Sequence, residues 1–176
     1  FNSTFTTDKK NWFDLNGTWA LNSSGYLTNT GIPGEYTSAL YKKRVYDDFT
    51  YTVKMKLKSV DAIKHFGGII IDGSGLMFTP PEYPTEKNVF WTGTYVVYRN
   101  NQQAAIFVWE GSIISGGLPW QTCSSIVPGG WNKIKVNTEG STIEVSFNGT
   151  PCLTYTHPAI DENSGYVALT QYRYDT

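Results

Sequence analysis

The strongest constraint on the fold is a strict alternation of apolar and polar residues over residues 49–59. The apolar set comprises Tyr51, Val53, Met55 and Leu57. The intervening polar set comprises Thr52, Lys54, Lys56 and Lys58. A period of two places these sets on opposite faces of a β-strand, one against a core and one in water. The pattern therefore predicts a strand in a sheet that covers a core on one side.

Similar segments recur along the chain and are separated by short stretches rich in turn residues. Residues 66–72 form a nearly continuous apolar run that contains Gly67-Gly68, which indicates a central strand approached closely by another layer. Glu139-Gly140 and Asn148-Gly149 lie between alternating segments, as in β-hairpins. We expect strands at 18–21, 25–29, 38–45, 49–59, 66–72, 89–99, 104–110, 131–137, 142–147, 152–156 and 165–173.

The composition favours strands over helices throughout the chain. Only 7 Ala and 9 Leu occur, against 21 Thr, 12 Tyr and 17 Gly. We therefore predict an all-β fold, a jelly roll of about eleven or twelve strands in two antiparallel sheets packed face to face. With 176 residues and no low-complexity linker, residues 1–176 are expected to form one domain.

The charge balance argues against two classes of partner. The formal net charge is −1, so no positive surplus attracts nucleic acid or an anionic membrane surface. No apolar run reaches the roughly 20 residues of a spanning helix, and residues 1–10 lack a signal-peptide pattern. We expect a mature, soluble domain that belongs to a larger multidomain protein and does not insert into membranes.

Cysteine and sequon usage favours an extracellular or cell-surface location. The two cysteines, Cys123 and Cys152, are interpreted as a disulfide, with two buried free thiols as the alternative. Four N-x-S/T triplets, which are acceptors for N-glycosylation, begin at Asn2, Asn16, Asn22 and Asn148. A Ser- and Thr-rich β protein also collects such triplets by chance.

The order of these signals resembles the concanavalin A-like lectin and glucanase jelly-roll superfamily. The similarity is greatest to its laminin-G-like, family 66-like carbohydrate-binding and keto-disaccharide-hydrolase-like (DUF1080) branches. The stretches that carry the resemblance are Asn16-Gly17-Thr18-Trp19, Gly25-Tyr26-Leu27, residues 46–53, residues 66–71, residues 129–136, residues 143–149 and residues 164–169.

The resemblance implies an architecture shared by lectins, binding modules, hydrolases and adhesion domains. In many relatives a structural Ca²⁺ ties the first strand to the last, and the carboxylates available here are Asp8, Asp14 and Asp175. Levan-binding-like modules hold a terminal sugar with an Arg and carboxylates, which implies that type of site without assigning its residues.

A hydrolase of this fold is the first alternative for function. Jelly-roll glucanases present their carboxylates in an E-x-D-x-E run, and this chain has none. Glu110 and Asp72 are the remaining candidates for an acid/base pair. His65 and His157 lie in no nucleophile or zinc motif.

Aromatic residues provide the leading functional hypothesis, because flat rings stack on the apolar face of a sugar. Arginine adds a planar fork of donors suited to vicinal hydroxyls or carboxylates. The candidate ligand-binding residues are Trp91, Tyr98, Arg99, Trp109, Trp120 and Arg173. If Tyr95 and Val97 face the core, Tyr98 faces outward, and Trp120 is expected in a loop.

Other aromatic residues are expected to fill the core, namely Trp19, Phe49, Phe66, Trp131 and Phe147. The sequence thus predicts a non-catalytic, lectin-like module that binds an oligo- or polysaccharide. The alternatives are a glycoside hydrolase or lyase of the same fold, and an adhesion or structural module.

Overall fold

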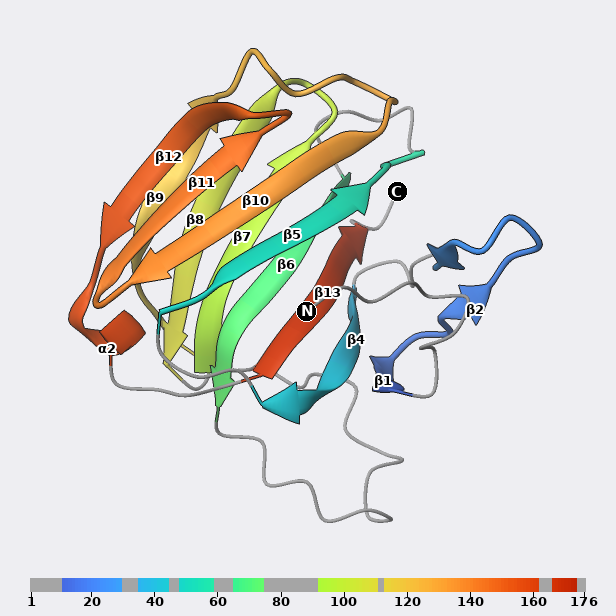
Figure 1. The fold of residues 1–176 in the computed structure, drawn as a ribbon, viewed down its shortest axis with the longest axis horizontal. Helices are drawn as coiled ribbons and strands as arrows, with labels where there is room; N and C mark the ends of the chain where they lie inside the picture. The colour runs from blue at the N-terminus through green and yellow to red at the C-terminus, as the bar shows by residue number, and fades with distance from the viewer. Residues whose placement is uncertain are drawn as a thin grey trace.

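The computed structural model of the chain describes residues 11–29, 35–44, 48–58, 65–74, 92–110, 113–161 and 166–173. Two antiparallel sheets lie face to face (Figure 1). The five-stranded sheet has the order β13-β6-β7-β8-β9 and comprises β6 (His65–Ser74), β7 (Thr92–Arg99), β8 (Gln103–Glu110), β9 (Ile113–Thr122) and β13 (Tyr166–Arg173). The four-stranded sheet has the order β12-β11-β10-β5 and comprises β5 (Thr50–Met55), β10 (Asn132–Glu139), β11 (Thr142–Phe147) and β12 (Thr150–Thr156).

Two shorter strand pairings and one helical turn complete the described fold. β1 (Trp12–Asn16) pairs with β4 (Glu35–Arg44), which lies alongside β13 (Figure 1). The two-residue strands β2 (Ala20–Leu21) and β3 (Leu27–Thr28) form a small hairpin. A single turn of helix, α2 (Pro158–Asp161), follows β12 and is the one helix among the described residues. It has too few residues to cross a membrane.

The all-β sandwich predicted from the sequence is confirmed. β5 and the residues that follow it keep the expected alternation, because Val53 and Leu57 are buried while Lys54, Lys56 and Lys58 are exposed. The described strands number thirteen, slightly more than expected, because β1 and β9 lie in segments without clear alternation. Residues 89–91 of one expected strand lie outside the described residues.

The main core fills the space between the two sheets. Its largest fully buried side chains include Tyr98, Ile69 and Ile106 from one sheet and Phe147 and Ile134 from the other. Burial of this apolar area stabilises the fold by about 25 cal/mol per Å². Trp19 lies in this core, and Phe49 packs against it, as expected.

Gly67 and Gly68 allow two close approaches in β6. A Cβ atom on Gly67 would lie 2.8 Å from a methyl group of Leu57 in the opposite layer. A Cβ atom on Gly68 would overlap the backbone carbonyl of Val96 on the neighbouring strand β7. The expected close approach of a second layer is therefore confirmed at Gly67.

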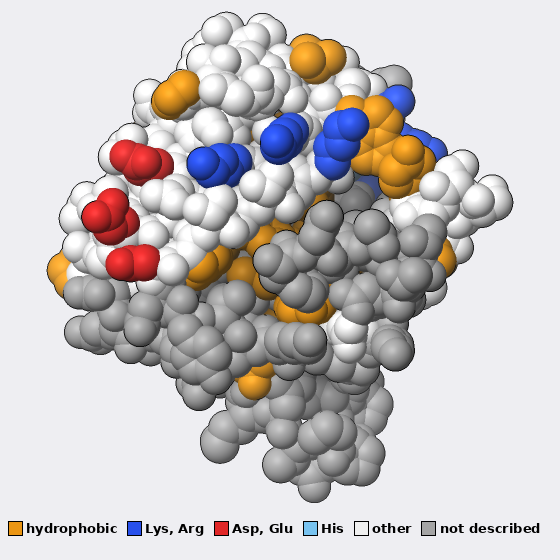
Figure 2. Space-filling view, in the orientation of Figure 1, with side chains coloured by type: hydrophobic (Ala, Val, Ile, Leu, Met, Phe, Trp, Pro, Cys, Tyr) orange, Lys and Arg blue, Asp and Glu red, His pale blue; other side chains and the backbone are white. Residues whose placement is uncertain are grey.

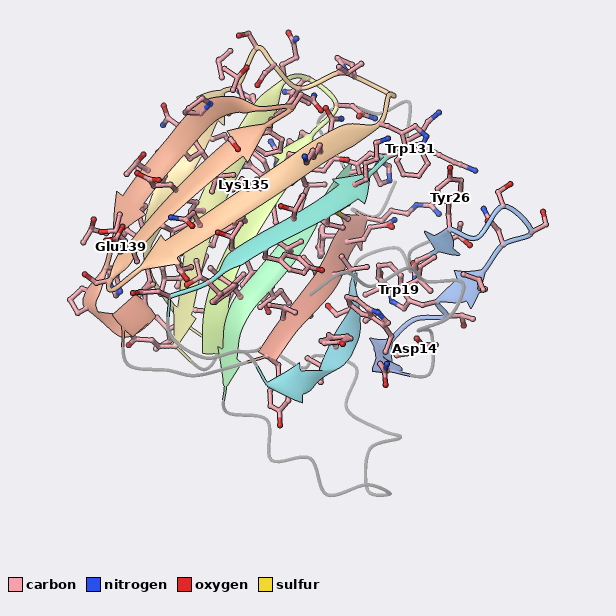
Figure 3. All side chains as sticks on the ribbon, in the orientation of Figure 1. Asp14, Trp19, Tyr26, Trp131, Lys135 and Glu139 are labelled. Atoms are coloured by element: carbon pink, nitrogen blue, oxygen red, sulfur yellow. A yellow bond between two sulfur atoms is a disulfide. The ribbon has the colours of Figure 1, made fainter. Side chains whose placement is uncertain are left out.

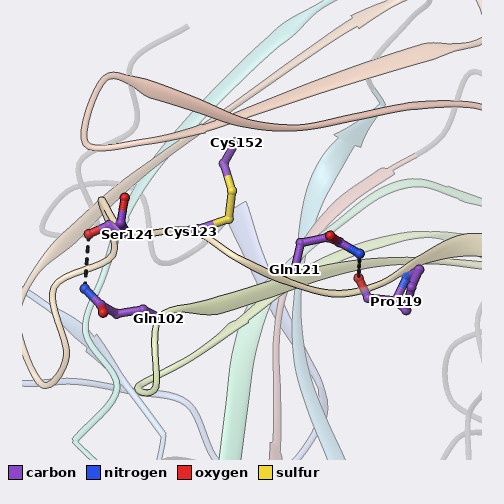
Figure 4. Close-up of a disulfide and its surroundings, with 6 residues drawn as sticks. All are labelled: Gln102, Pro119, Gln121, Cys123, Ser124 and Cys152. Carbon is purple, nitrogen blue, oxygen red and sulfur yellow. Dashed lines mark hydrogen bonds between the residues drawn. A yellow bond between two sulfur atoms is a disulfide. The ribbon is translucent and has the colours of Figure 1, made fainter.

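A disulfide joins Cys123 and Cys152 (Figure 4), with 5.7 Å between their Cα atoms. It connects the residue after β9 to β12, and therefore links the edges of the two sheets. Gln102 donates from Nε2 to the carbonyl oxygen of Ser124 at 3.1 Å beside the bridge (Figure 4). The predicted disulfide is confirmed.

Candidate functional site

The outer face of the five-stranded sheet carries a second apolar cluster, distinct from the core between the sheets. Strand alternation produces it, because residues next to core residues on the same strand point to the opposite face. Its buried members are Leu40, Phe66, Ile70, Tyr95, Val97, Ala105 and Ala168. Five partly exposed rings pack against these residues, namely Phe107, Trp109, Trp120, Tyr166 and Tyr172. We call this cluster the aromatic face.

Arg99 and Trp120 form the polar centre of the aromatic face. The guanidinium carbon of Arg99 lies 3.7 Å from the centroid of the Trp120 ring and 6.0 Å from that of Phe66. Arg99 ends β7 and Trp120 lies near the end of β9, so β8 separates their strands. A cation at this distance is attracted by the negative face of an indole ring.

Three more rings surround this pair. Phe66 stacks on Tyr172 of the neighbouring strand β13, with centroids 5.3 Å apart and planes 18° apart. Trp120 meets Phe66 and Phe107 edge-to-face at 5.7 and 6.0 Å. These are the separations at which aromatic pairs attract each other. Rings from β6, β8, β9 and β13 thus form one continuous patch, to which β7 adds Arg99.

A second ring pair lies on the same face. Tyr95 of β7 and Trp109 of β8 have centroids 6.1 Å apart and planes tilted by 58°. Trp109 is partly exposed, whereas Tyr95 is buried beneath it. Trp109 therefore lies on the same face as Arg99 and Trp120, two other candidates from the sequence.

Two expectations for β7 and β9 are wrong. Val96 and Tyr98 face the core between the sheets, and Tyr95 and Val97 face outward, which reverses the expected orientation. Tyr98 is fully buried, so it is a core residue and is unavailable to a ligand. Trp120 lies on an edge strand and not in a loop.

The other two predicted ligand-binding residues do not join this centre. Arg173 ends β13 and pairs in register with His65. Strand alternation directs it to the face opposite Tyr172, away from Phe66 and Trp120. Trp91 lies outside the described residues.

The candidate acid/base pair is only partly described. Glu110 is exposed at the end of β8, and Asp72 lies in β6, with β7 between the two strands. The two strands are therefore about 9–10 Å apart. The side chain of Asp72 lies outside the described part of the chain, so the pair stays a hypothesis.

The calcium ligands also stay a prediction. Asp8 and Asp175 lie outside the described residues. Asp14 is exposed, and its Oδ2 accepts a long hydrogen bond of 3.4 Å from the backbone N–H of Trp19 (Figure 3). In the described segments no group of three or more His, Cys, Asp or Glu side chains could hold a metal ion.

Three partly exposed rings of the aromatic face, Phe107, Tyr166 and Tyr172, were not among the candidates predicted from the sequence, and one Trp was assigned wrongly. Phe66 is buried as expected, but beneath the aromatic face and not between the sheets. Trp131, expected in the core, is 39% exposed. The sequence contained a signal for the exposure of Trp131. Alternate residues of a strand share a face, so Trp131 lies on the same face as the exposed Lys133 and Lys135, whereas Asn132 lies on the buried face.

A family comparison matches this architecture. The family model of the 3-keto-alpha-glucoside-1,2-lyase-like domain matches residues 1–174. The chain belongs to this family. The keto-disaccharide-hydrolase-like resemblance inferred from the sequence is therefore confirmed. No curated protein sequence matches this member of the family.

Solved structures with the same fold include sugar-binding proteins and a glucanase. A carbohydrate-binding module of family 66 from Bacillus subtilis is 14% identical, with a TM-score of 0.65 over 94% of this chain and 92% of that one. A legume lectin-like domain from Entamoeba histolytica is 10% identical, with a TM-score of 0.66 over 97% and 84%. A β-glucanase from Bacillus licheniformis is 11% identical, with a TM-score of 0.63 over 92% and 78%. At these identities the likeness establishes a concanavalin A-like fold, which sugar-binding proteins share.

Proposed function

We propose that this domain is a lectin-like module that binds an oligo- or polysaccharide non-covalently on the aromatic face. The observation that carries the proposal is the placement of Arg99 over the ring of Trp120 at 3.7 Å. A guanidinium that lies over an aromatic ring is attracted by that ring, and its planar fork of donors suits the geometry of vicinal hydroxyl groups. Trp120 therefore orients Arg99 before any ligand arrives, which lowers the entropy lost on binding.

The rings beside Arg99 supply the apolar half of the site. Phe107 and Tyr172 are partly exposed; Phe107 contacts the ring of Trp120, and Tyr172 stacks on Phe66. The C–H face of a pyranose or furanose can cover such rings while its hydroxyls meet the guanidinium. Trp109 extends this apolar surface along β8.

An extracellular or cell-surface setting fits the chemistry of this chain. The Cys123–Cys152 bridge is of a kind that persists in oxidising compartments and is rare in the cytosol. In a larger protein, such a module would raise the local concentration of an attached domain at a polysaccharide.

The proposal is tested by a glycan array followed by titration calorimetry with the best ligand. Trp120→Ala should weaken binding at least about tenfold, as expected for a central aromatic anchor. Arg99→Lys keeps the charge and removes the planar fork, and should weaken binding similarly. Trp131→Ala removes a Trp from the opposite sheet and serves as the matched control, with unchanged affinity for a neutral glycan.

Undiminished affinity in both the Trp120 and Arg99 variants would overturn the aromatic face as the binding site. A chain that binds no glycan on the array would instead support the adhesion or structural alternative.

An enzyme is the second candidate, because the matched family is described as lyase-like. Glu110 directly follows Trp109 in the sequence and has an exposed carboxylate at the end of β8. If the wild-type domain releases product from the glycan that it binds, Glu110→Gln should remove turnover and leave affinity unchanged. Absence of any released product would favour the non-catalytic module.

A further inference from the structure

We propose a second binding site, for an acidic polysaccharide, on the outer face of the four-stranded sheet. It is formed by the exposed rings of Tyr26 and Trp131 and by five exposed lysines, Lys54, Lys56, Lys58, Lys133 and Lys135. We call this surface the lysine face. It lies on the sheet opposite the aromatic face, so it is independent of the site proposed there.

The register of β5 and β10 concentrates positive charge at this surface. Lys54 and Lys133 are direct cross-strand partners, and Lys135 is the next outward residue along β10. Cβ atoms of direct partners lie about 4.5–5.5 Å apart, where like charges repel and destabilise the sheet. Lys56 and Lys58 continue the exposed row beyond the end of β5. An anion placed between these ammonium groups would remove that repulsion.

Among the described residues, the acidic side chains on this face lie apart from the lysines. Asp48, Glu139 and Glu144 are exposed around the β10–β11 hairpin, and Asp48 accepts a hydrogen bond from the backbone N–H of Gly140. Figure 2 shows the acidic side chains gathered at one end of this face and the basic ones running to the opposite end, beside a hydrophobic patch. The lysines thus form a positively charged surface beside that patch.

The hydrophobic patch coincides with two exposed aromatic rings. Tyr26 is 47% exposed and Trp131 is 39% exposed, with ring centroids 4.7 Å apart and planes tilted by 43°. Figure 3, in the same orientation, shows them side by side, one from the β2–β3 hairpin and one just before β10. Exposed neighbouring rings of this size commonly mark interaction sites.

Trp131 is presented by a rigid loop over residues 123–131. Asn132 is fully buried and holds the loop with both ends of its amide: Oδ1 accepts from the backbone N–H of Val127, and Nδ2 donates to the carbonyls of Val127 and Gly130. Asn148 donates from Nδ2 to the carbonyl of Ser125. The disulfide at Cys123 fixes the start of the loop. A ring held in this way loses little conformational freedom on binding.

An acidic polysaccharide is the ligand class that suits this combination. Uronic acid units combine an apolar C–H face for the two rings with a carboxylate for the ammonium groups. Single-stranded nucleic acid would also use rings and lysines. The fold is one that sugar-binding proteins share, and this favours the polysaccharide over nucleic acid.

The experiment measures binding of the intact domain to polygalacturonate, with neutral dextran and oligo-dT as comparison probes. Wild-type domain should bind polygalacturonate, with affinity that falls as salt is raised from about 50 to 200 mM. Lys54→Gln with Lys133→Gln should weaken this binding at least about tenfold and flatten its salt dependence. Trp131→Ala should also weaken it, because the stacking surface is lost.

Two controls make the result specific. Thr150→Glu with Thr154→Glu, on exposed positions of β12, gives the same net charge as the double lysine variant and should change affinity less than about twofold. Trp120→Ala should leave polygalacturonate binding intact, whether or not it abolishes binding of a neutral glycan. This separates the lysine face from the aromatic face.

Four outcomes would overturn the proposal. The first is that the domain binds polygalacturonate no more tightly than dextran, and the second is that the lysine and threonine double variants weaken polygalacturonate binding equally. The third is that Trp120→Ala loses polygalacturonate binding. The fourth is that the domain binds oligo-dT more tightly than polygalacturonate. The last outcome would assign the surface to nucleic acid.

Discussion

Whether an aromatic side chain is buried between the sheets or lies on an outer face depends on which face of its strand it occupies. Tyr98 and Arg99 are neighbours in β7, yet Tyr98 fills the core and Arg99 covers Trp120 outside it. Trp131 and Asn132 show the same division, with the large ring exposed and the small amide buried. The amide is buried because its hydrogen bonds hold the preceding loop, which an indole could not do.

Tyr98 should make the stability of the domain sensitive to alkaline pH. Burial raises the pKa of its phenol, because desolvation disfavours the phenolate. Stability is therefore unaffected below about pH 10 and falls above it, with this one group contributing up to about 1.4 kcal/mol per pH unit. Tyr98→Phe should flatten that decline, measured as the free energy of unfolding in urea from about pH 8 to pH 11.

Phe147→Leu provides the comparison for this prediction. It changes the ring packed against Tyr98 without removing an ionisable group, and should lower stability by about 1 kcal/mol at every pH. An alkaline decline equally steep in wild type and Tyr98→Phe would show that Tyr98 does not control it.

Among the elements, the segment from β9 to β10 depends most on its covalent and polar connections. Cys123 and Cys152 are separated by 29 residues, and their bridge restricts the unfolded chain. Replacing both by Ser should lower the free energy of unfolding by about 3–4 kcal/mol in the chain-entropy model. Urea denaturation of both proteins measures the difference.

Reduction of the wild-type protein provides an independent check. Dithiothreitol should bring the stability of the wild type to that of the double Ser variant and leave the variant unchanged. A loss below about 1 kcal/mol would mean that the hydrogen bonds of Asn132 and Asn148 hold the segment without the bridge.

Strands with clear alternation or hairpin turns could be predicted from the sequence, whereas one important strand could not. β5, β10 and β11 follow their patterns closely. β9 contains Gly116-Gly117 and Pro119, which are typical of loops. It tolerates proline because it lies at the edge of its sheet, where a missing N–H need not break a ladder. This exception hid the strand position of Trp120.

At the scale of the whole molecule, the two proposed binding faces of the sandwich differ in their chemistry. The aromatic face draws its residues from six strands, β4, β6, β7, β8, β9 and β13, and the tertiary fold alone brings β4 and β13 beside the others. Local patterns could therefore predict Arg99, Trp109 and Trp120 as candidates, but could not predict their contacts with Phe66 and Tyr172. For the lysine face, the sequence predicted only that Lys54, Lys56 and Lys58 face water; their pairing with β10 and the aromatic pair required the tertiary fold.

Nuclear magnetic resonance tests the central claim most directly, because the indole N–H signals of the Trp residues report on each face separately. The ¹⁵N-labelled domain is titrated with the neutral glycan selected on the array, after Trp→Phe variants have assigned the signals. Glycan binding on the aromatic face should shift the signals of Trp120 and Trp109 and leave that of Trp131 in place. The claim would be contradicted if the glycan at saturating concentration shifted the Trp131 signal and left the signals of Trp120 and Trp109 in place.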